Sequence, residues 1–288
     1  MLNFLKFFVK IMCIVLLFIV IYGELQNYVF KKGTYFKSQW INDLNSKNFD
    51  VVIIGNSRGA LFELNDSLFN YMNLSEDASG LKTTYCQIYS FFKKNNSVKK
   101  VVLEYDIFSL RKINDFKRSS RWLPYFDDQE IYLTLKDEHE IFKIHKYLPA
   151  ISYSVFKYDW NFASFINNLF NLKDSPWGER GYMYSCNDYI DQAPKGRLDY
   201  DTLRPNWFWI DKINDLVKKN NSELLLISSP YYDLENDYQS DVLFRKKMAE
   251  KKLTFFDHSK IFLGNKEYFS DNRHLNCKGV KNYMPIVE

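Results

Sequence analysis

Three residues that lie far apart in the chain have the types needed for nucleophilic chemistry: Ser57, Asp271 and His274. A serine hydroxyl attacks a carbonyl carbon only when a base takes its proton, and imidazole has a pKa that suits this task near neutral pH. An aspartate three residues before the histidine can hold the far ring nitrogen and stabilise the imidazolium. Together these types are typical of a serine nucleophile with its base and orienting acid.

Ser57 follows a run that predicts a buried strand. Residues 51–54 read Val-Val-Ile-Ile, a continuous rather than alternating apolar run, which predicts a strand covered on both faces. Ligand sites on open parallel sheets lie beyond the carboxyl ends of the strands. A serine between a strand and a helix is also a common helix N-cap, and this is the alternative to a nucleophile.

The second motif, residues 271–274, reads Asp-Asn-Arg-His and lies near the end of the chain. In the alternative interpretation, Asp271 caps a helix that begins near Asn276 and His274 is a surface residue. The other histidines are weaker candidates for the base, because two lie in charged, helix-like sequence and one directly follows an aspartate: His139, His145 and His258.

Residues 55–59 match the Gly-x-Ser-x-Gly nucleophile elbow of α/β-hydrolases letter for letter. In that fold the nucleophile follows a strand in the middle of the sheet, and the acid is well separated from the histidine. Here Ser57 follows the first predicted strand, and Asp271 precedes His274 by three residues. The order of the motifs therefore disfavours the elbow.

The two motifs together resemble the SGNH (GDSL-like) hydrolase and acyltransferase superfamily. Residues 55–57 (Gly-Asn-Ser) stand where that family has Gly-Asp-Ser, and residues 271–279 (DNRHLNCKG) resemble its closing Asp-x-x-His block. The resemblance covers residues 51–110 and 206–288. A single N-terminal anchor followed by such a domain also resembles the membrane-anchored, DltD-like envelope members of the family. It implies a three-layer α/β/α fold with a parallel, flavodoxin-like sheet, and it implies a catalytic set of Ser57, His274 and Asp271.

The resemblance also implies an oxyanion hole, formed by the backbone N–H groups of Ser57 and Gly80 and by an asparagine after the third strand. Residues 104–106 (Glu-Tyr-Asp) stand where the asparagine is expected. An ionised Asp106 cannot donate a hydrogen bond and would repel an oxyanion. Two arginines beside the motifs, Arg58 and Arg273, are candidates for contacts with substrate or developing charge, and the alternative is ordinary surface charge.

The elements that must position these residues alternate between strand and helix, which predicts a parallel sheet with helices on both faces. Strands are predicted at residues 51–54, 71–74, 101–105, 223–228 and 253–256. Helices are predicted at 81–94, 206–219 and 238–251 and from 278, with a short helix or turn at 58–70. An aromatic and charged insertion or cap is predicted at about 115–205, with helix-like pieces at 128–146 and 151–172.

The N-terminus predicts a membrane anchor at residues 1–23, followed by a stalk at 24–50 and the α/β domain at 51–288. Residues 11–22 carry no charge, and extension back to Phe4 gives the roughly 20 residues that span a bilayer. A cleaved signal peptide is the alternative, but no small-x-small cleavage pattern follows. Lysines on both sides of the anchor leave its orientation open by charge alone: Lys6, Lys10, Lys31, Lys32 and Lys37.

Composition excludes some classes of function. The formal net charge is +4 over 288 residues, and 46% of the residues are hydrophobic, so a sizeable core is expected and disorder is not. No block of Lys and Arg predicts nucleic-acid binding. No cysteine pair has zinc-ligand spacing, and no metal or cofactor is expected. One cysteine lies in the anchor, and the other three allow one disulfide or three buried thiols: Cys13, Cys86, Cys186 and Cys277.

These patterns predict a membrane-anchored serine acyl-ester hydrolase or O-acyltransferase that acts on cell-envelope polysaccharide or another glycan. The expected partners are the membrane, the glycan or acyl-ester substrate, and a membrane protein that donates acyl groups. The domain is expected outside the cytoplasm. The alternatives are a catalytically inactive envelope protein of the same fold that binds a glycan or partner, and a domain that faces the cytoplasm.

Overall fold

A computed structural model of the chain describes residues 2–33, 36–43, 48–77, 79–94, 97–105, 116–156, 162–170, 172, 180–183, 186, 189–190, 207–233 and 238–288. The chain divides into two compact units. Unit 1 contains Met1–Asp43 and Asp115–Ser175, and unit 2 contains Leu44–Asn114 and Pro176–Glu288. The first part of the predicted insertion, up to residue 175, therefore belongs to one unit with the N-terminal segment.

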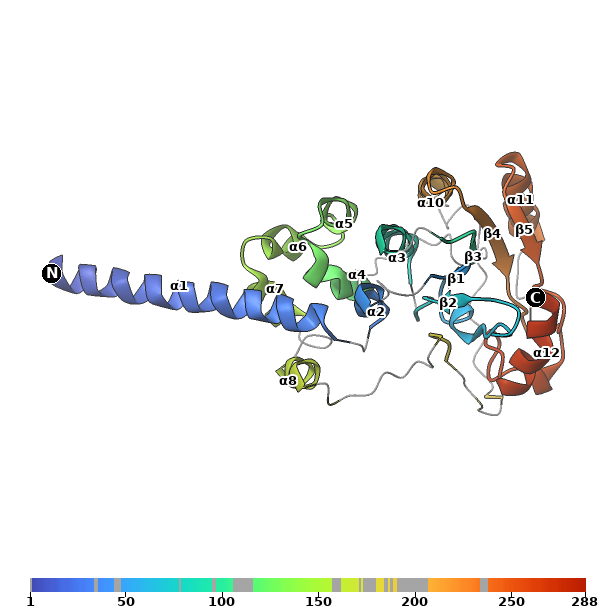
Figure 1. Cartoon of the computed structure of the whole chain (residues 1–288), viewed down its shortest axis with the longest axis horizontal. Helices are drawn as coiled ribbons and strands as arrows, with labels where there is room; N and C mark the ends of the chain where they lie inside the picture. The colour runs from blue at the N-terminus through green and yellow to red at the C-terminus, as the bar shows by residue number, and fades with distance from the viewer. Residues whose placement is uncertain are drawn as a thin grey trace. The chain divides into compact units, whose positions relative to one another are not determined.

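Helix α1, Leu2–Lys31, is the longest element of unit 1 and is drawn in blue in Figure 1. It is long and apolar enough to cross a membrane. Large side chains along its apolar part, such as Phe4 and Phe18, are exposed, whereas Val29 and Phe30 near its end are buried. The helix therefore has an apolar part without protein cover among the described residues and a packed end.

The rest of unit 1 is a cluster of short helices around an aromatic core. The Phe30 ring lies 5.1 Å from the Tyr153 ring and 6.1 Å from the Phe165 ring. His145 is buried in the same core, where loss of solvation lowers its pKa to about 3 and keeps it neutral. The short elements are α2 (Lys37–Asp43), α4 (Phe116–Ser119), η4 (Ser120–Tyr125), α5 (Gln129–Leu135), α6 (Glu140–His145), α7 (Pro149–Val155) and α8 (Phe162–Phe170).

Unit 2 is built on a five-stranded parallel sheet with the order β2-β1-β3-β4-β5. Val52 in β1 lies opposite Met72 in β2 and Val101 in β3. The chain goes to one side of β1 first and to the other side afterwards, so the order reverses between β1 and β3, where doubly wound sheets bind ligands. The strands are β1 (Val51–Ile54), β2 (Tyr71–Asn73), β3 (Lys100–Glu104), β4 (Glu223–Ser228) and β5 (Thr254–Asp257).

Four longer helices accompany the sheet. Helix α10 packs against α3 and β4. Helix α12 places Tyr283 and Met284 in a core cluster with Val51 and Ile53 of β1, two residues that share a face because strand side chains alternate. The helices are α3 (Leu81–Lys94), α10 (Trp207–Lys219), α11 (Tyr238–Glu250) and α12 (Cys277–Val287), with the short helices η2 (Gly59–Leu61) and η5 (Lys266–Tyr268) between strands or near the end.

The predicted α/β class, parallel sheet and apolar N-terminal helix are confirmed, and α3 has the predicted bounds. The helix-like stretches 128–146 and 151–172 are wrong in detail, because each divides in two. The first stretch contains two helices, and each has its own N-cap. The Asp128 side chain accepts backbone hydrogen bonds at the start of α5, and the His139 side chain accepts one at the start of α6.

Candidate active site

Ser57 lies on a tight turn directly after β1. The side-chain oxygen of Asn56 accepts a hydrogen bond from the Arg58 N–H at 2.8 Å, and the Asn56 carbonyl accepts one from Ala60 at 3.1 Å. A Cβ atom at Gly55 would come within 2.8 Å of the Glu104 Cβ, so only glycine fits where β1 leaves the sheet. The Gly-Asn-Ser sequence thus turns the chain sharply and presents a half-buried serine.

The second motif is a short closed loop before α12. Phe269 and Leu275 form an antiparallel bridge, and the Ser270 N–H donates to the His274 carbonyl at 2.8 Å. Inside the loop, Asp271 Oδ1 accepts hydrogen bonds from the backbone N–H groups of Arg273 at 2.7 Å and His274 at 2.9 Å. The aspartate therefore fixes the backbone that carries the histidine.

The two motifs meet although 217 residues separate them. Ser57 Oγ lies 2.8 Å from His274 Nε2, and His274 Nδ1 lies 2.8 Å from Asp271 Oδ2. When the Nδ1 proton is donated to the carboxylate, Nε2 keeps its lone pair and can accept the serine proton. The distances are those of a nucleophile, a general base and an orienting acid.

The charge of Asp271 is stabilised within this site. Partial burial opposes its ionisation, but hydrogen bonds from the His274 side chain and from the Arg273 and His274 backbone outweigh burial and lower its pKa to about 2. The carboxylate therefore remains ionised at any pH at which His274 could act as a base. The N-cap of α12, which was the alternative role for Asp271, is Asn276. The Asn276 side-chain oxygen accepts a hydrogen bond from the Gly279 N–H at 3.0 Å.

Replacing Asp271 by asparagine is expected to destabilise the protein in a pH-dependent way. The carboxyl pKa is lower in the folded state than its usual 3.8, so its contribution is complete above that value and is lost as the pH falls towards 2. The difference in unfolding free energy between wild type and Asp271→Asn should thus shrink by about 2 kcal/mol between pH 6 and pH 2. Urea denaturation across this range measures it, and a constant difference would contradict the stabilised carboxylate.

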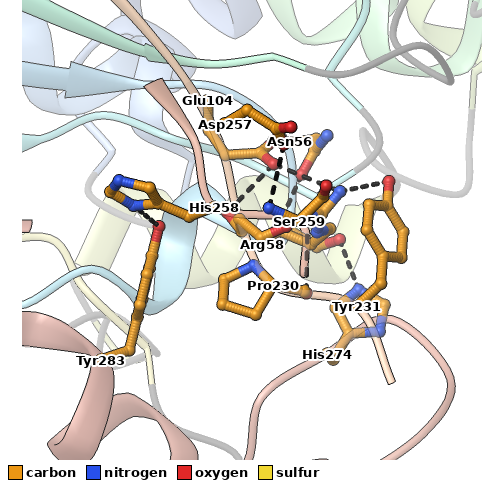
Figure 2. Close-up of polar contacts among 12 residues, drawn as sticks. Asn56, Arg58, Glu104, Pro230, Tyr231, Asp257, His258, Ser259, His274 and Tyr283 are labelled. Atoms are coloured by element: carbon orange, nitrogen blue, oxygen red, sulfur yellow. Dashed lines mark hydrogen bonds and ion pairs between the residues drawn. The ribbon is translucent and has the colours of Figure 1, made fainter. Parts of the chain in front are cut away.

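Arg58 lies under the serine turn and is almost fully buried, with 5% of its side chain exposed. Its Nη1 lies 3.4 Å from Glu104 Oε1 and donates to the Tyr231 hydroxyl, while Nη2 donates to the Ser229 carbonyl. Figure 2 shows the Arg58 side chain between those of Glu104 and Tyr231. The guanidinium thus joins the turn after β1 to the ends of β3 and β4. A contact of Arg58 with substrate or developing charge stays a prediction.

Glu104 is a buried residue beside the serine turn that the sequence interpretation missed. It is completely buried at the end of β3, and Ser229 Oγ donates to its Oε1 at 3.1 Å. The signal was present in the sequence as an acidic residue at the end of an apolar strand, since a buried carboxylate requires a partner.

The structure describes two of the three remaining predicted site residues, Gly80 and Arg273. Gly80 directly precedes α3. Its carbonyl accepts hydrogen bonds from Thr84 N at 2.9 Å and Thr83 Oγ1 at 2.7 Å, and a Cβ there would meet nothing within 4 Å. Arg273 lies in the loop of the base and is half-buried. Asp106 lies outside the described residues.

None of the other three histidines has Ser57 as its partner in the structure. His258 Nδ1 pairs with the Tyr283 hydroxyl at 2.9 Å, as Figure 2 shows. Burial lowers the pKa of His258, although the nearby Asp257 carboxylate opposes this. His139 caps α6, and His145 is buried in unit 1. His274 is thus the histidine placed to act on the serine.

The loop of the base is held by a distant segment of unit 2. The Ile190 N–H donates to the Ser270 carbonyl at 2.9 Å, and the Tyr189 hydroxyl donates to the Asn272 side chain. A disulfide joins Cys186 to Cys277, the first residue of α12, across 91 positions of sequence. The sequence left one disulfide and three buried thiols as alternatives. The structure contains the disulfide, and Cys86 is a buried thiol outside it.

The site contains no metal-ligand set among the described residues, where no three His, Cys, Asp or Glu side chains are grouped to hold an ion. Comparison with models of known protein families and with curated proteins found no match.

Proposed function

We propose that this chain is a membrane-anchored serine enzyme that cleaves or transfers acyl esters, with Ser57 as nucleophile, His274 as general base and Asp271 as orienting acid. One observation carries the proposal: a single line of contacts, 2.8 Å and 2.8 Å long, runs from Ser57 through His274 to Asp271. Either hydrogen bond alone is also found where a side chain only stabilises the fold. The two together on the two nitrogens of one imidazole are the arrangement that activates a serine.

The first half-reaction begins when Ser57 Oγ attacks the ester carbonyl carbon and His274 Nε2 takes the hydroxyl proton. The carbonyl π electrons move to oxygen, and Asp271 stabilises the imidazolium. When the tetrahedral intermediate collapses, the ester C–O bond breaks and His274 gives its proton to the leaving alkoxide. The products are an alcohol and an acyl group on Ser57.

In the second half-reaction, water or a sugar hydroxyl attacks the acyl-serine carbonyl carbon while His274 takes its proton. The bond between the acyl carbon and Ser57 Oγ then breaks, and His274 returns the proton to Oγ. Water yields an acid, and a glycan hydroxyl yields an O-acylated glycan. The family resemblance supports the Ser57 and Gly80 backbone N–H groups as donors to the oxyanion. Such donors each contribute about 2.7–4 kcal/mol to transition-state stabilisation.

The proposed architecture is the three-layer SGNH arrangement, supported by the strand order β2-β1-β3-β4-β5 and by α12 packing on β1. We place the catalytic unit outside the cytoplasm on a single-pass anchor. The disulfide between Cys186 and Cys277 supports this location, because structural disulfides persist in oxidising compartments. An envelope polysaccharide or glycan is the substrate class that fits such a location and the resemblance.

A fluorophosphonate probe tests the activated serine on the full-length protein in detergent. The probe forms a covalent bond with a serine hydroxyl whose proton is removed by a neighbouring base, so wild type should be labelled and Ser57→Ala should not. The matched control is Ser67→Ala, a nearby exposed turn serine, and it should label like wild type. Failure of folded wild type to label would favour the alternative function, a non-catalytic envelope protein that binds a glycan or partner.

A further inference from the structure

Unit 1 has exposed apolar and aromatic side chains close to the point where the apolar part of α1 ends. A Cβ atom at Gly23 would come within 2.8 Å of Ala150 N and 3.2 Å of Pro149 Cβ, so the start of α7 abuts α1 at this residue. The Phe165 ring of α8 lies 6.0 Å from the Tyr22 ring. Figure 1 shows α7 and α8 beside the second half of α1. Two helices of unit 1 therefore meet α1 at residues 22–23.

The residues next to these contacts are exposed and have the character of a membrane interface. Tyr147, just before α7, is 72% exposed, Ile151 is 40% exposed, and Phe162 at the start of α8 is 68% exposed. Lys146 beside Tyr147 is also exposed. Aromatic rings and lysines with long apolar stems are enriched where protein crosses the boundary between acyl chains and headgroups.

Length places this boundary on α1. A bilayer core is spanned by about 20 apolar residues. The exposed apolar residues of α1 run from Phe4 through Ile21 without a protein neighbour that buries them. A span of this length ends at Tyr22 and Gly23, which is where α7 and α8 contact the helix. Tyr147, Ile151 and Phe162 lie in or just before the helices that contact α1 where the proposed span ends. Their exposed side chains thus extend the apolar surface of the span.

We infer that Tyr147, Ile151 and Phe162 form an interfacial contact with the bilayer that α1 enters, and that they seat unit 1 on the membrane rather than leave it on a free tether. The occupant is the headgroup and upper acyl region of phospholipids. Burial of the apolar surface of such side chains in the interface favours one fixed orientation of α1 relative to the bilayer. The inference rests on the proposed membrane anchor.

The test uses full-length protein in vesicles of phosphatidylcholine and phosphatidylglycerol that contain a doxyl-labelled lipid. In a Cys13→Ser background, single variants Phe162→Cys, Tyr147→Cys and Phe8→Cys carry the fluorophore NBD. Asp127→Cys is the matched control, because Asp127 is exposed and contacts Lys31, eight residues or about 12 Å further along α1 than Gly23.

The expected result is a blue-shifted emission and at least twofold quenching by the doxyl lipid at positions 162, 147 and 8, with little quenching at 127. Quenching at position 8 but at neither 147 nor 162 would overturn the interfacial contact and leave the anchor intact. Absence of quenching at position 8 would overturn the anchor and the contact together. Equal quenching at 127 and 162 would show general immersion of unit 1 and would also overturn the inference.

Discussion

Ser57→Ala is expected to reduce acyl-ester turnover by about four to six orders of magnitude in kcat. Alanine removes the atom that forms the acyl-enzyme, and the residual rate comes from substrate binding and oxyanion stabilisation alone. Ser57 is half-buried on a turn and contributes no backbone hydrogen bond from its side chain, so the fold should remain. Steady-state hydrolysis of an acetyl ester by the full-length protein measures the effect.

Two comparisons make the result specific to this serine. Ser67→Ala should retain wild-type turnover, because Ser67 lies in an exposed turn and only its backbone N–H contacts Asn65. A His274→Ala variant should lose about as much activity as Ser57→Ala, and the double variant no more, because residues that act as one unit are not additive. Retention of more than a tenth of the wild-type rate by Ser57→Ala would refute its role as nucleophile.

Glu104→Leu is expected to lower the free energy of unfolding by about 3–5 kcal/mol. Arg58 is 5% exposed and Glu104 is fully buried, so the substitution removes a negative charge 3.4 Å from a desolvated guanidinium. The Tyr231 hydroxyl and the Ser229 carbonyl remain as acceptors but carry no negative charge. Urea denaturation at neutral pH measures the loss.

An exposed ion pair of the same unit is the control. Asp211 contacts Lys251 at 2.6 Å but is half exposed, and Asp211→Asn should cost no more than about 1 kcal/mol. The double variant Arg58→Met with Glu104→Leu should be more stable than Glu104→Leu alone, because it removes both charges. A loss below about 1 kcal/mol for Glu104→Leu would mean that the buried pair does not support the fold.

The same double variant separates stability from activity. Arg58 directly follows the nucleophile and anchors its turn to Ser229 and Tyr231 at the end of β4. A protein with methionine and leucine at these positions should fold but should have a lower kcat, because the serine is held less firmly against His274. We expect KM to change little, since the guanidinium faces the interior.

Local patterns in the sequence were sufficient for much of the fold. The continuous Val-Val-Ile-Ile run of β1 can only be covered on both faces, and the helical spacing of apolar residues in α3 predicted its bounds at residues 81–94. Alternation of strand and helix outside the insertion then predicted a parallel sheet. The N-terminal helix followed from the length of its apolar run alone.

The site could be predicted as a list of residue types but not as a geometry. The sequence allowed Asp271 to cap a helix or to orient a histidine, and both are good local chemistry. Tertiary structure separated the two roles, since Asn276 caps α12 while Asp271 Oδ2 faces His274 Nδ1. A contact such as that between Ser57 and His274 depends on strand order and loop closure, which no local pattern encodes.

The sequence alone thus determined the three candidate residues and their places after β1 and before α12: Ser57, Asp271 and His274. It could do so because strand, turn and cap preferences act over a few residues. Only the tertiary structure decided that Arg58 pairs with Glu104, that Cys186 bonds to Cys277, and that residues 115–175 pack into one unit with α1. Each of these depends on which distant surfaces are buried together. The hydrophobic effect has no preferred direction. Which surfaces pack together is therefore decided by the whole chain and not by any one segment.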